Sequence, residues 1–568
     1  MLALATAALA ALAALAPPAS AAKKNFELNV QSFKAAPDGY LANVYGVNGV
    51  MQYPIVVNKG DSLSVKVNNK LDVPTSIHYH GLFQSGTQFA DGAAGVTQCP
   101  IAPGDSMTYD FAVPDQHGTY WWHAHYRAQY TKGIRGPLIV RDPANEPYTK
   151  DYDEEYIVML TDWFHAPTSE DLLVPFLDSN DGAEPVPESG LINAKGRFNC
   201  SLVTDGTPCN PKAPLERFDF VKGKRYRLRI INAASMATFN FSIDGHPMTV
   251  IEADGIDTQK TTVDMIRISA AQRYSVIVTA NADKPGNFWM RAEIDTGLYT
   301  VYNPGVLDPS VRAIVSYTKS DADPTSTPRT QNITYLNPYT LLPYKQTPIT
   351  DAAAYSLIMS FQIVPDDATN KSRAFTSVDG YFTDSAYEPP KVPILYDAIR
   401  NNTQQALSNV IPVDYNSIVE MTVYNDDPME HVFHLHGHVF QVVGHGTQLN
   451  LVPQPSGNKP MYPERDTIAV PGCKIRKPGG APGGPADEGL CGGSKGYVRI
   501  RFVANNPGAW LFHCHIEWHM MQGLVITFVS GADKLAKTRV PPRIIDGCAR
   551  SGVKLPAARY WSSLPSSA

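Results

Sequence analysis

Residues 498–519, VRIRFVANNPGAWLFHCHIEWH, determine how the rest of the chain is interpreted. Apolar and polar residues alternate in the first part, which is the pattern of a half-buried β-strand. A turn rich in Asn, Pro and Gly follows, and a second strand then passes through aromatic residues into the run His513, Cys514 and His515. The stretch therefore predicts two consecutive strands, with metal-ligand side chains at the end of the second.

Two other stretches repeat this scheme. Residues 109–126 are YDFAVPDQHGTYWWHAHY, and residues 274–294 are YSVIVTANADKPGNFWMRAEI. The middle copy has MRA at 290–292, where the outer copies have HAH and HCH. The strand pattern thus survives without histidine, so we expect the outer histidines to serve something other than the fold.

A second pattern precedes each copy, at residues 60–81, 223–246 and 416–438. Each of these contains an alternating strand, an Asn, a polar loop and a second strand that ends at or near a histidine. Repetition of two linked patterns predicts three related β-sandwiches in an all-β protein.

The length of the chain agrees with several domains. At about 150 residues per domain, 568 residues suggest three or four. Charged, proline-containing linkers lie near 141–155 and 319–330. We predict a leader over residues 1–21 and three domains, which we list as 22–145, 146–325 and 326–568.

Histidines are concentrated in the two outer domains. Ten of the fifteen histidines fall into four clusters, and each cluster contains an H-x-H pair. Residues i and i+2 of a strand face the same way, so each pair aims two imidazoles at one volume, about 6.6 Å apart along the strand. The four pairs are His78 and His80, His123 and His125, His434 and His436, and His513 and His515.

Cys514 lies between His513 and His515 and therefore points to the opposite face of its strand. With His431 and His519 it makes a His₂Cys set, which is typical of a blue-copper site. Zinc is the main rival metal, but zinc sites close with four ligands and often use Cys-x₂-Cys spacing, which this sequence lacks. Eight imidazoles in one place exceed what one zinc ion uses, whereas several coppers can share them.

The motifs HYHG, HAH, HVFHLHGH and HCHIEWH together resemble those of the multicopper oxidases, especially the fungal laccases and the related iron-oxidising enzymes. The resemblance covers nearly all of the chain after the leader. It implies three cupredoxin-like Greek-key domains and four coppers per chain. Copper ligands come from the first and last domains, and the middle domain supplies none.

Carried onto this sequence, the family pattern assigns a ligand set to each copper. Type 1 copper takes His431, Cys514 and His519; type 2 takes His78 and His434; one type 3 takes His80, His123 and His515; and the other takes His125, His436 and His513.

Three further positions follow from the same resemblance. The axial neighbour of type 1 copper would be Leu524, which offers no donor and should raise the copper potential. The acidic groups near the three-copper cluster would be Asp91 and Glu517, as proton donors or as hydrogen-bond acceptors that orient a ligand histidine. Met520 and Met521 are expected to pack in the core.

The implied reaction joins a one-electron donor to O₂. Reduction of O₂ to two waters takes four electrons, while phenols and Fe(II) give one at a time. Electrons would enter at the type 1 site and pass through Cys514 to His513 and His515. Two other functions fit these residues less well. A one-copper electron carrier would not need the histidines of the first domain. A copper-storage or structural protein would not need a cysteine that bridges two sites.

The nature of the electron-donating substrate is indicated by weaker patterns around GAEPVPESGLIN, residues 182–193. Glu184 resembles a ferroxidase carboxylate, and Glu188 resembles the laccase carboxylate. Tyr387 and Asp295 resemble further ferroxidase positions. A last iron-site carboxylate is not recognised after KVP, where Asp397 lies several residues early. Each of these carboxylates could instead be an ordinary solvated surface charge. For the whole protein we favour a laccase, and Fe(II) oxidation is the alternative function.

Residues 1–21 are short, apolar and alanine-rich, and they end in an A-x-A pattern that predicts a cleaved secretory leader. We expect a secreted, monomeric glycoprotein without a membrane anchor. A net charge of −6 argues against a nucleic-acid partner. Five N-glycosylation sequons agree with secretion: Asn199, Asn240, Asn332, Asn370 and Asn401.

Six cysteines remain once Cys514 is set aside, and six allow fifteen pairings. Proximity in the sequence suggests that Cys200 pairs with Cys209 and that Cys473 pairs with Cys491. The remaining pair, Cys99 and Cys548, would tie the first domain to the C-terminal tail. Buried free thiols are the alternative.

Overall fold

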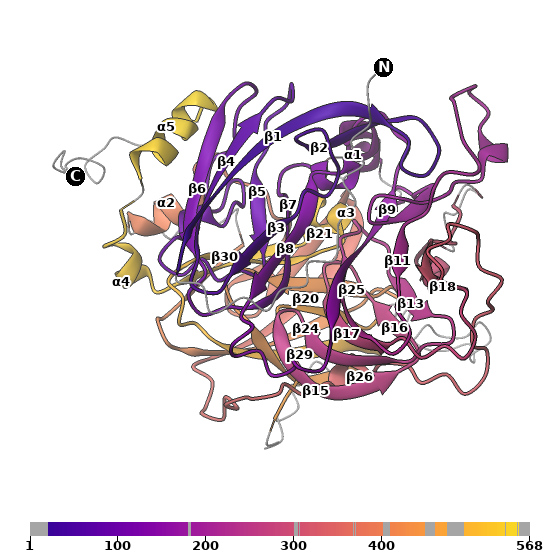
Figure 1. The fold of residues 1–568 in the computed structure, drawn as a ribbon. Helices are drawn as coiled ribbons and strands as arrows, with labels where there is room; N and C mark the ends of the chain where they lie inside the picture. The colour runs from indigo at the N-terminus through magenta and orange to yellow at the C-terminus, as the bar shows by residue number, and fades with distance from the viewer. Residues whose placement is uncertain are drawn as a thin grey trace, which may run out of the picture.

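The computed structural model describes residues 21–179, 183–299, 305, 307–366, 369, 371–400, 409–448, 461–473, 494–539, 541–553 and 555. Their strands form six sheets, two from each third of the chain (Figure 1). The prediction of an all-β protein built from repeated sandwiches is confirmed.

The first pair of sheets uses strands β1 to β8, and each sheet has four strands. Their orders are β2 (Ala42–Val47), β1 (Lys23–Ala35), β4 (Ser62–Asn69), β6 (Ser106–Ala112), and β3 (Ile55–Asn58), β8 (Arg135–Arg141), β7 (Gly118–Ala124), β5 (Ile77–His80).

The second pair has six and five strands. Their orders are β10 (Ser189–Ile192), β9 (Glu154–Trp163), β12 (Arg225–Asn232), β17 (Arg273–Thr279), β14 (Met248–Ala253), β15 (Ile256–Val263), and β11 (Arg217–Asp219), β19 (Arg312–Ser316), β18 (Asn287–Ile294), β13 (Phe239–Ile243), β16 (Ile266–Ile268).

The third pair has seven and five strands. Their orders are β22 (Phe382–Ser385), β21 (Lys371–Val378), β20 (Tyr355–Asp366), β24 (Ile418–Asn425), β29 (Lys495–Val503), β26 (Phe440–Gln448), β27 (Glu464–Arg465), and β23 (Val410–Val413), β31 (Val525–Ser530), β30 (Gly508–Cys514), β25 (His431–Leu435), β28 (Thr467–Val470).

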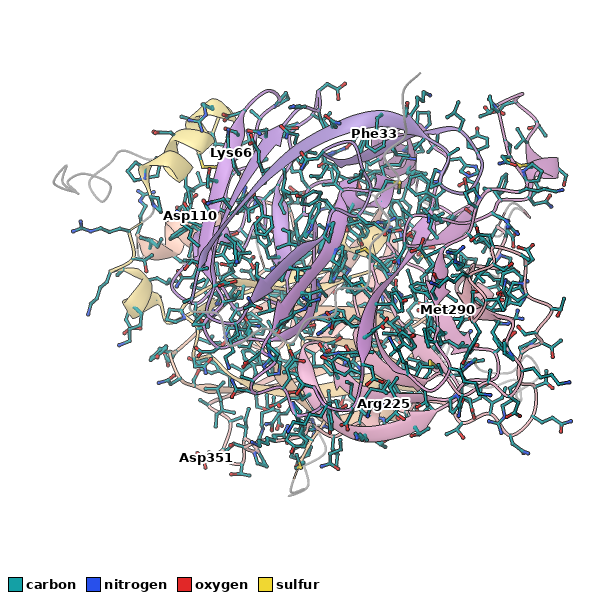
Figure 2. All side chains as sticks on the ribbon, viewed as in Figure 1. Phe33, Lys66, Asp110, Arg225, Met290 and Asp351 are labelled. Atoms are coloured by element: carbon teal, nitrogen blue, oxygen red, sulfur yellow. A yellow bond between two sulfur atoms is a disulfide. The ribbon has the colours of Figure 1, made fainter. Side chains whose placement is uncertain are left out.

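Strand pairing repeats in all three thirds. The pairs β4–β6, β12–β17 and β24–β29 are antiparallel, and so are β5–β7, β13–β18 and β25–β30. These are the strands on which the two repeated sequence patterns fall. The period-2 alternation therefore predicted both the strands and their equivalence, because alternate residues enter the core between the sheets, where side chains fill the space (Figure 2).

Helices are few and short: α1 (Glu170–Asp178), α2 (Ile394–Ile399), α3 (Glu517–Met521), α4 (Ala532–Leu535) and α5 (Pro542–Arg550). α3 begins three residues after the end of β30. No helix among the described residues is long and apolar enough to cross a membrane.

Two disulfides join described residues, and both were predicted. Cys99 is bonded to Cys548, which fastens α5 beside β6 (Figure 1), and Cys200 is bonded to Cys209. Cys491 lies outside the described residues, as do Asn370, Asn401 and nearly all of the predicted leader.

Candidate metal centres

Strand register places the histidines of each outer domain opposite one another. His78 on β5 pairs with His123 on β7, and His434 on β25 pairs with His513 on β30. In the middle domain the equivalent pair is Ile243 opposite Met290, and both side chains are buried. The same backbone arrangement thus holds ligands in two domains and a plain apolar contact in the third.

The eight predicted imidazoles meet in one buried cluster between the first and third domains. His78 stacks on His436 with ring centroids 4.0 Å apart, and His80 stacks on His434 at 3.7 Å. Each stack joins one histidine from each outer domain. The ligand atoms of His125, His436 and His513 lie within 4.8 Å of one another, as the predicted type 3 set requires.

The ring nitrogens of this cluster fit bound metal. His80 Nδ1 and the Nε2 atoms of His78 and His434 are buried and have no hydrogen-bond partner among the described residues. The same holds for the Nε2 atoms of His123, His125 and His515. Buried polar atoms without partners are rare in native proteins, and a metal ion is one explanation for a set of them. Imidazole nitrogen is a donor that copper favours.

Burial lowers the pKa of seven imidazoles of the cluster and favours their neutral form: His80, His123, His125, His434, His436, His513 and His515. It lowers the pKa of His515 to about 3 and of His436 to about 4, and it lowers the pKa of His123 well below its ordinary value. Desolvation is the main cause, and repulsion between neighbouring rings adds to it. Only the neutral ring has a lone pair for a metal, so the cluster is ready to bind one.

Asp91 contacts this cluster directly, whereas Glu517 is linked to it through Tyr130, whose ring packs against His123, and the two acids differ in charge. Asp91 Oδ2 accepts from His436 Nδ1 at 2.9 Å, and its backbone oxygen accepts from His78 Nδ1 at 2.6 Å. Burial opposes its charge, but the histidines outweigh burial and lower the pKa of Asp91. Glu517 accepts from Ala128 N at 2.9 Å, and burial raises its pKa to about 8.

The predicted type 1 set forms a separate buried site on the other face of β30. Cys514 Sγ lies 3.8 Å from His431 Nδ1 and 3.7 Å from His519 Nδ1. All three residues are almost completely buried, and no other described cysteine is unbridged. A thiolate with two imidazoles is the donor set of a trigonal blue-copper site.

Electrostatics at this site oppose those of the eight-histidine cluster. Burial disfavours the thiolate, but hydrogen bonds from His431 and His519 outweigh burial and lower the pKa of Cys514 to about 6. Burial also disfavours protonated His519, but Cys514 and Glu184 raise the pKa of His519 to about 10. The site therefore favours a Cys514 thiolate beside a protonated His519. A bound copper ion would replace the imidazole proton as the positive charge next to the thiolate.

Leu524 lies in the hydrophobic core that also contains Cys514, and its side chain is fully buried. Its backbone oxygen accepts from Cys514 N at 3.1 Å. Leu524 is therefore next to Cys514 through the backbone, and its aliphatic side chain offers no donor atom. Met521 packs against the same core, and Met520 packs against the core of the first domain, as expected.

Carboxylates face the outer nitrogen of both type 1 histidines. Glu184 Oε1 accepts from His519 Nε2 at 2.9 Å, as the sequence predicted. Asp427 Oδ1 lies 3.9 Å from His431 Nε2 and was missed. Asp397, which lies several residues before the expected position of the last iron-site carboxylate, is buried on α2, and that helix packs in the first-domain core. The pattern that could have found Asp427 is an Asp four residues before the first histidine of the HVFHLHGH motif.

The other predicted substrate residues have different neighbours. Glu188 accepts from His165 N at 3.0 Å, and Asp295 Oδ2 accepts from Arg267 at 3.0 and 3.2 Å. Tyr387 is buried, which raises the pKa of its phenol, and its hydroxyl has no partner among the described residues. Of these four described residues, Glu184 alone forms a hydrogen bond with a type 1 ligand.

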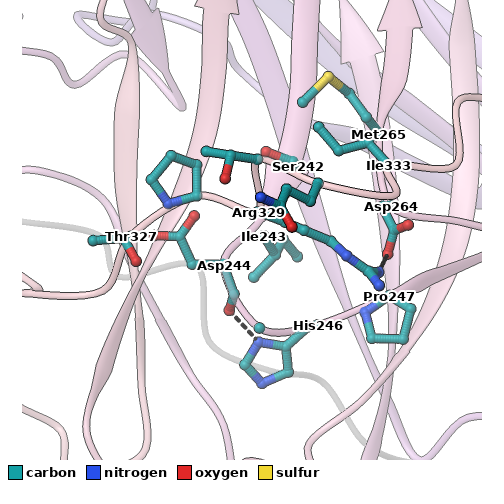
Figure 3. A pocket seen from close by; sticks show the side chains of 14 residues that line it. Ser242, Ile243, Asp244, His246, Pro247, Asp264, Met265, Thr327, Arg329 and Ile333 are labelled. Atoms are coloured by element: carbon teal, nitrogen blue, oxygen red, sulfur yellow. Dashed lines mark hydrogen bonds and ion pairs between the residues drawn. The ribbon is translucent and has the colours of Figure 1, made fainter.

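A surface cavity of about 630 Å³ lies in the middle domain, away from both sites (Figure 3). Its charged and imidazole groups are paired with one another or with the backbone: Asp264 accepts from Arg329 at 2.6 Å, and His246 Nδ1 donates to the Asp244 backbone at 2.8 Å. No predicted site residue lines it.

Fold and ligand geometry together define a copper protein of three cupredoxin domains. Profiles of the multicopper oxidase family match residues 29–145, 154–320, and 381–475 with 493–534. The chain belongs to this family, and it is therefore an oxidoreductase that binds copper.

Relatives of two kinds are similar to it. The iron transport multicopper oxidase FET3 of Gibberella zeae is 34% identical over 94% of this chain and 80% of its own length. Laccase-2 of Trametes versicolor is 36% identical over 92% of this chain and 93% of its own length. The crystal structure of Fet3p, a multicopper oxidase that functions in iron import, covers 94% of this chain and 96% of its own, with 30% identity and a TM-score of 0.79.

Proposed function

We propose that this multicopper oxidase is a secreted laccase, which takes single electrons from small phenols at the type 1 site and passes them to O₂ at the eight-histidine cluster. The contact between Glu184 and His519 carries the proposal because it sets a proton acceptor beside a type 1 ligand, while the resemblance of the Glu184 motif to that of a ferroxidase keeps Fe(II) as the second candidate. Four bound coppers would store the electrons that O₂ reduction requires. The two disulfides agree with an oxidising compartment.

Glu184 can handle the proton that a phenol loses with its electron. One oxygen of the carboxylate accepts from His519 Nε2, and the other is available for a phenolic hydroxyl. The group is about an eighth exposed, so a substrate from solvent can approach it. A base at that position makes oxidation easier because a phenol that keeps its proton must become a radical cation.

Cys514 links the two sites covalently. Its thiolate faces His431 and His519, while its chain neighbours His513 and His515 face the eight-histidine cluster. An electron therefore crosses a few bonds rather than open space. At the cluster, Asp91 holds negative charge while Glu517 holds a proton near neutral pH, so Glu517 is the group that can supply protons to reduced oxygen.

Oxidation of Fe(II) is the second candidate, and Asp427 is the observation that favours it. With Glu184, it provides a carboxylate beside each type 1 histidine. Hard oxygen donors suit iron ions, and the Asp427 side chain is 29% exposed. The bond between Asp295 and Arg267 weakens this candidate, because that carboxylate already neutralises a cation.

Oxygen uptake with a diphenol and with Fe(II) separates the two candidates. A laccase should show the higher kcat/KM for the diphenol, and Glu184→Ala should lower it. A ferroxidase should prefer Fe(II), and Asp427→Ala should raise its KM for iron without changing diphenol oxidation. Asp426→Ala is the matched control, because the neighbouring Asp426 pairs with Lys495 at 2.7 Å instead of facing a type 1 histidine.

A further inference from the structure

One buried arginine of the middle domain reaches the metal cluster although that domain supplies no ligand. Arg273, at the start of β17, donates two hydrogen bonds to Asp466 of the third domain, both 2.7 Å long. Its Nε donates to the backbone oxygen of Thr119 in the first domain at 3.1 Å. A single side chain therefore joins all three domains.

Asp466 and Thr467, in turn, contact one ligand from each outer domain. The Asp466 backbone oxygen accepts from His434 Nδ1 at 2.9 Å. The Thr467 hydroxyl donates to Asp466 Oδ1 at 2.8 Å and accepts from His80 Nε2 at 3.3 Å. These bonds use His434 Nδ1 and His80 Nε2, which leaves His434 Nε2 and His80 Nδ1 buried, without partners and free for metal.

The backbone next to His80 packs directly on the ion pair. A Cβ atom on Gly81 would lie 2.6 Å from an Arg273 nitrogen and 2.8 Å from Asp466 Oδ2, and Gly81 has a φ of +89°. Glycine is required here because any side chain would displace the pair. The position of the pair and the position of His80 are therefore coupled.

Charge balance explains why the pair is an arginine and an aspartate. Asp466 is buried and needs a cation, which Arg273 provides. The next carboxylate, Asp254, accepts from Arg465 at 2.7 and 3.0 Å and from Arg273 N at 2.9 Å. The four side chains form a continuous buried network, and loss of Arg273 would leave Asp466 without its two hydrogen bonds and its cation, beside two ligand histidines.

We propose that Arg273 is a positioning residue through which the ligand-free middle domain orients His80 and His434 for copper binding. The inference rests on the copper sites described above. It assigns the middle domain a direct part in building the three-copper cluster, separate from its part in the fold. The type 1 site should be unaffected, because none of its three ligands forms a hydrogen bond with Arg273, Asp466 or Thr467 in the described part of the chain.

Copper occupancy of purified holoenzyme tests the proposal. In Arg273→Met we expect an affinity for type 2 copper about 10- to 100-fold below wild type, while the blue type 1 band per chain stays unchanged. Type 2 copper is followed by its electron paramagnetic resonance signal and by total copper per chain. Arg273→Lys keeps the charge but loses the two-pronged contact, and we expect it to lie between wild type and Arg273→Met.

Arg227→Met is the matched control. Arg227 is also a buried middle-domain arginine, but it pairs with Glu146 and Glu252, away from Asp466. Wild-type type 2 occupancy in Arg273→Met would overturn the proposal, and so would an equal loss in Arg227→Met. If Arg273→Met does not fold, Thr467→Val tests the same link, and an unchanged type 2 signal there overturns it. A wild-type protein without type 2 copper would instead refute the proposed function.

Discussion

The two candidate copper sites share strand β30, yet their imidazoles differ in acid–base behaviour. In the eight-histidine cluster, burial lowers the pKa of His515 to about 3. Four residues further along the chain, the Cys514 thiolate and Glu184 overcome burial and raise the pKa of His519 to about 10. One short sequence thus supplies ligands to a neutral site and to a charged one.

Strand alternation creates this difference. His513 and His515 project to one face of β30, where other imidazoles surround them, and Cys514 projects to the opposite face. A metal that binds at the type 1 site must displace imidazole protons, whereas burial favours the neutral rings of His513 and His515 in the cluster. We therefore expect changes at Cys514 and at Asp91 to affect different coppers.

The largest effect is expected for Cys514→Ser. A serine hydroxyl does not ionise in this range, so the site loses its thiolate donor and the covalent electron route. We expect the blue band and all measurable turnover to disappear, while copper falls by one per chain and the circular dichroism spectrum is retained. A variant that still turns over would contradict the proposed route.

Asp91→Asn should affect the other site. The amide keeps the shape of the carboxylate but removes the charge that His436 and His78 contact. We expect an about 10- to 100-fold loss of copper affinity at the cluster and slower reoxidation by O₂, with reduction of type 1 copper by substrate unchanged. Stopped-flow measurement of each half-reaction distinguishes the two. Equal slowing of both would remove the separation between the sites.

Glu517 should make stability depend on pH. Its pKa is about 8 in the folded chain and near 4.5 when unfolded, so folding favours the protonated form. Below about pH 4.5 Glu517 is protonated in both the folded and the unfolded chain, so it does not change the free energy of unfolding. That free energy then falls progressively as the pH rises to about 8. Each unit corresponds to about 1.4 kcal/mol, so the loss amounts to a few kcal/mol.

Glu517→Gln removes this titration and should flatten the decline between pH 5 and 8. Thermal unfolding midpoints of wild type and variant at both pH values provide the measurement. At pH 5 the two proteins should be close, and the variant should be the more stable at pH 8. A parallel decline in both proteins would show that Glu517 ionises normally in the folded chain.

The sequence predicted the strands and the ligand histidines because both depend on local spacing. Period-2 alternation sets which side chains enter a core, and an H-x-H pair on a strand aims both rings at one volume. Repetition of the two strand patterns also indicated that the three domains have related folds. It also showed that Met290 of the middle copy stands where the outer copies have histidine, and the strand register then placed Ile243 opposite it.

The missed and altered residues depend on the shape of a loop or on contacts between separate segments. Asp427 faces His431 because its loop bends through bonds from Met429 N to Asp427 and from Asp427 N to Asn425. Arg267, on β16, donates a hydrogen bond to Asp295, which lies 28 positions further along the chain. Neither contact leaves a periodic pattern, and the same is true of the link from Arg273 to Asp466, which are 193 positions apart.

Leu524→Met should produce the smallest change, confined to the type 1 site. A thioether beside the copper favours Cu(II) over Cu(I), so the type 1 potential should fall. Each fall of about 59 mV makes removal of one electron from a donor about tenfold less favourable, and oxidation of donors with high potentials should slow most. Redox titration of the blue band measures the shift, and copper content and the type 2 signal serve as controls. An unchanged potential would mean that residue 524 does not lie on the axis of the copper, and Met521 would then be the next position to substitute.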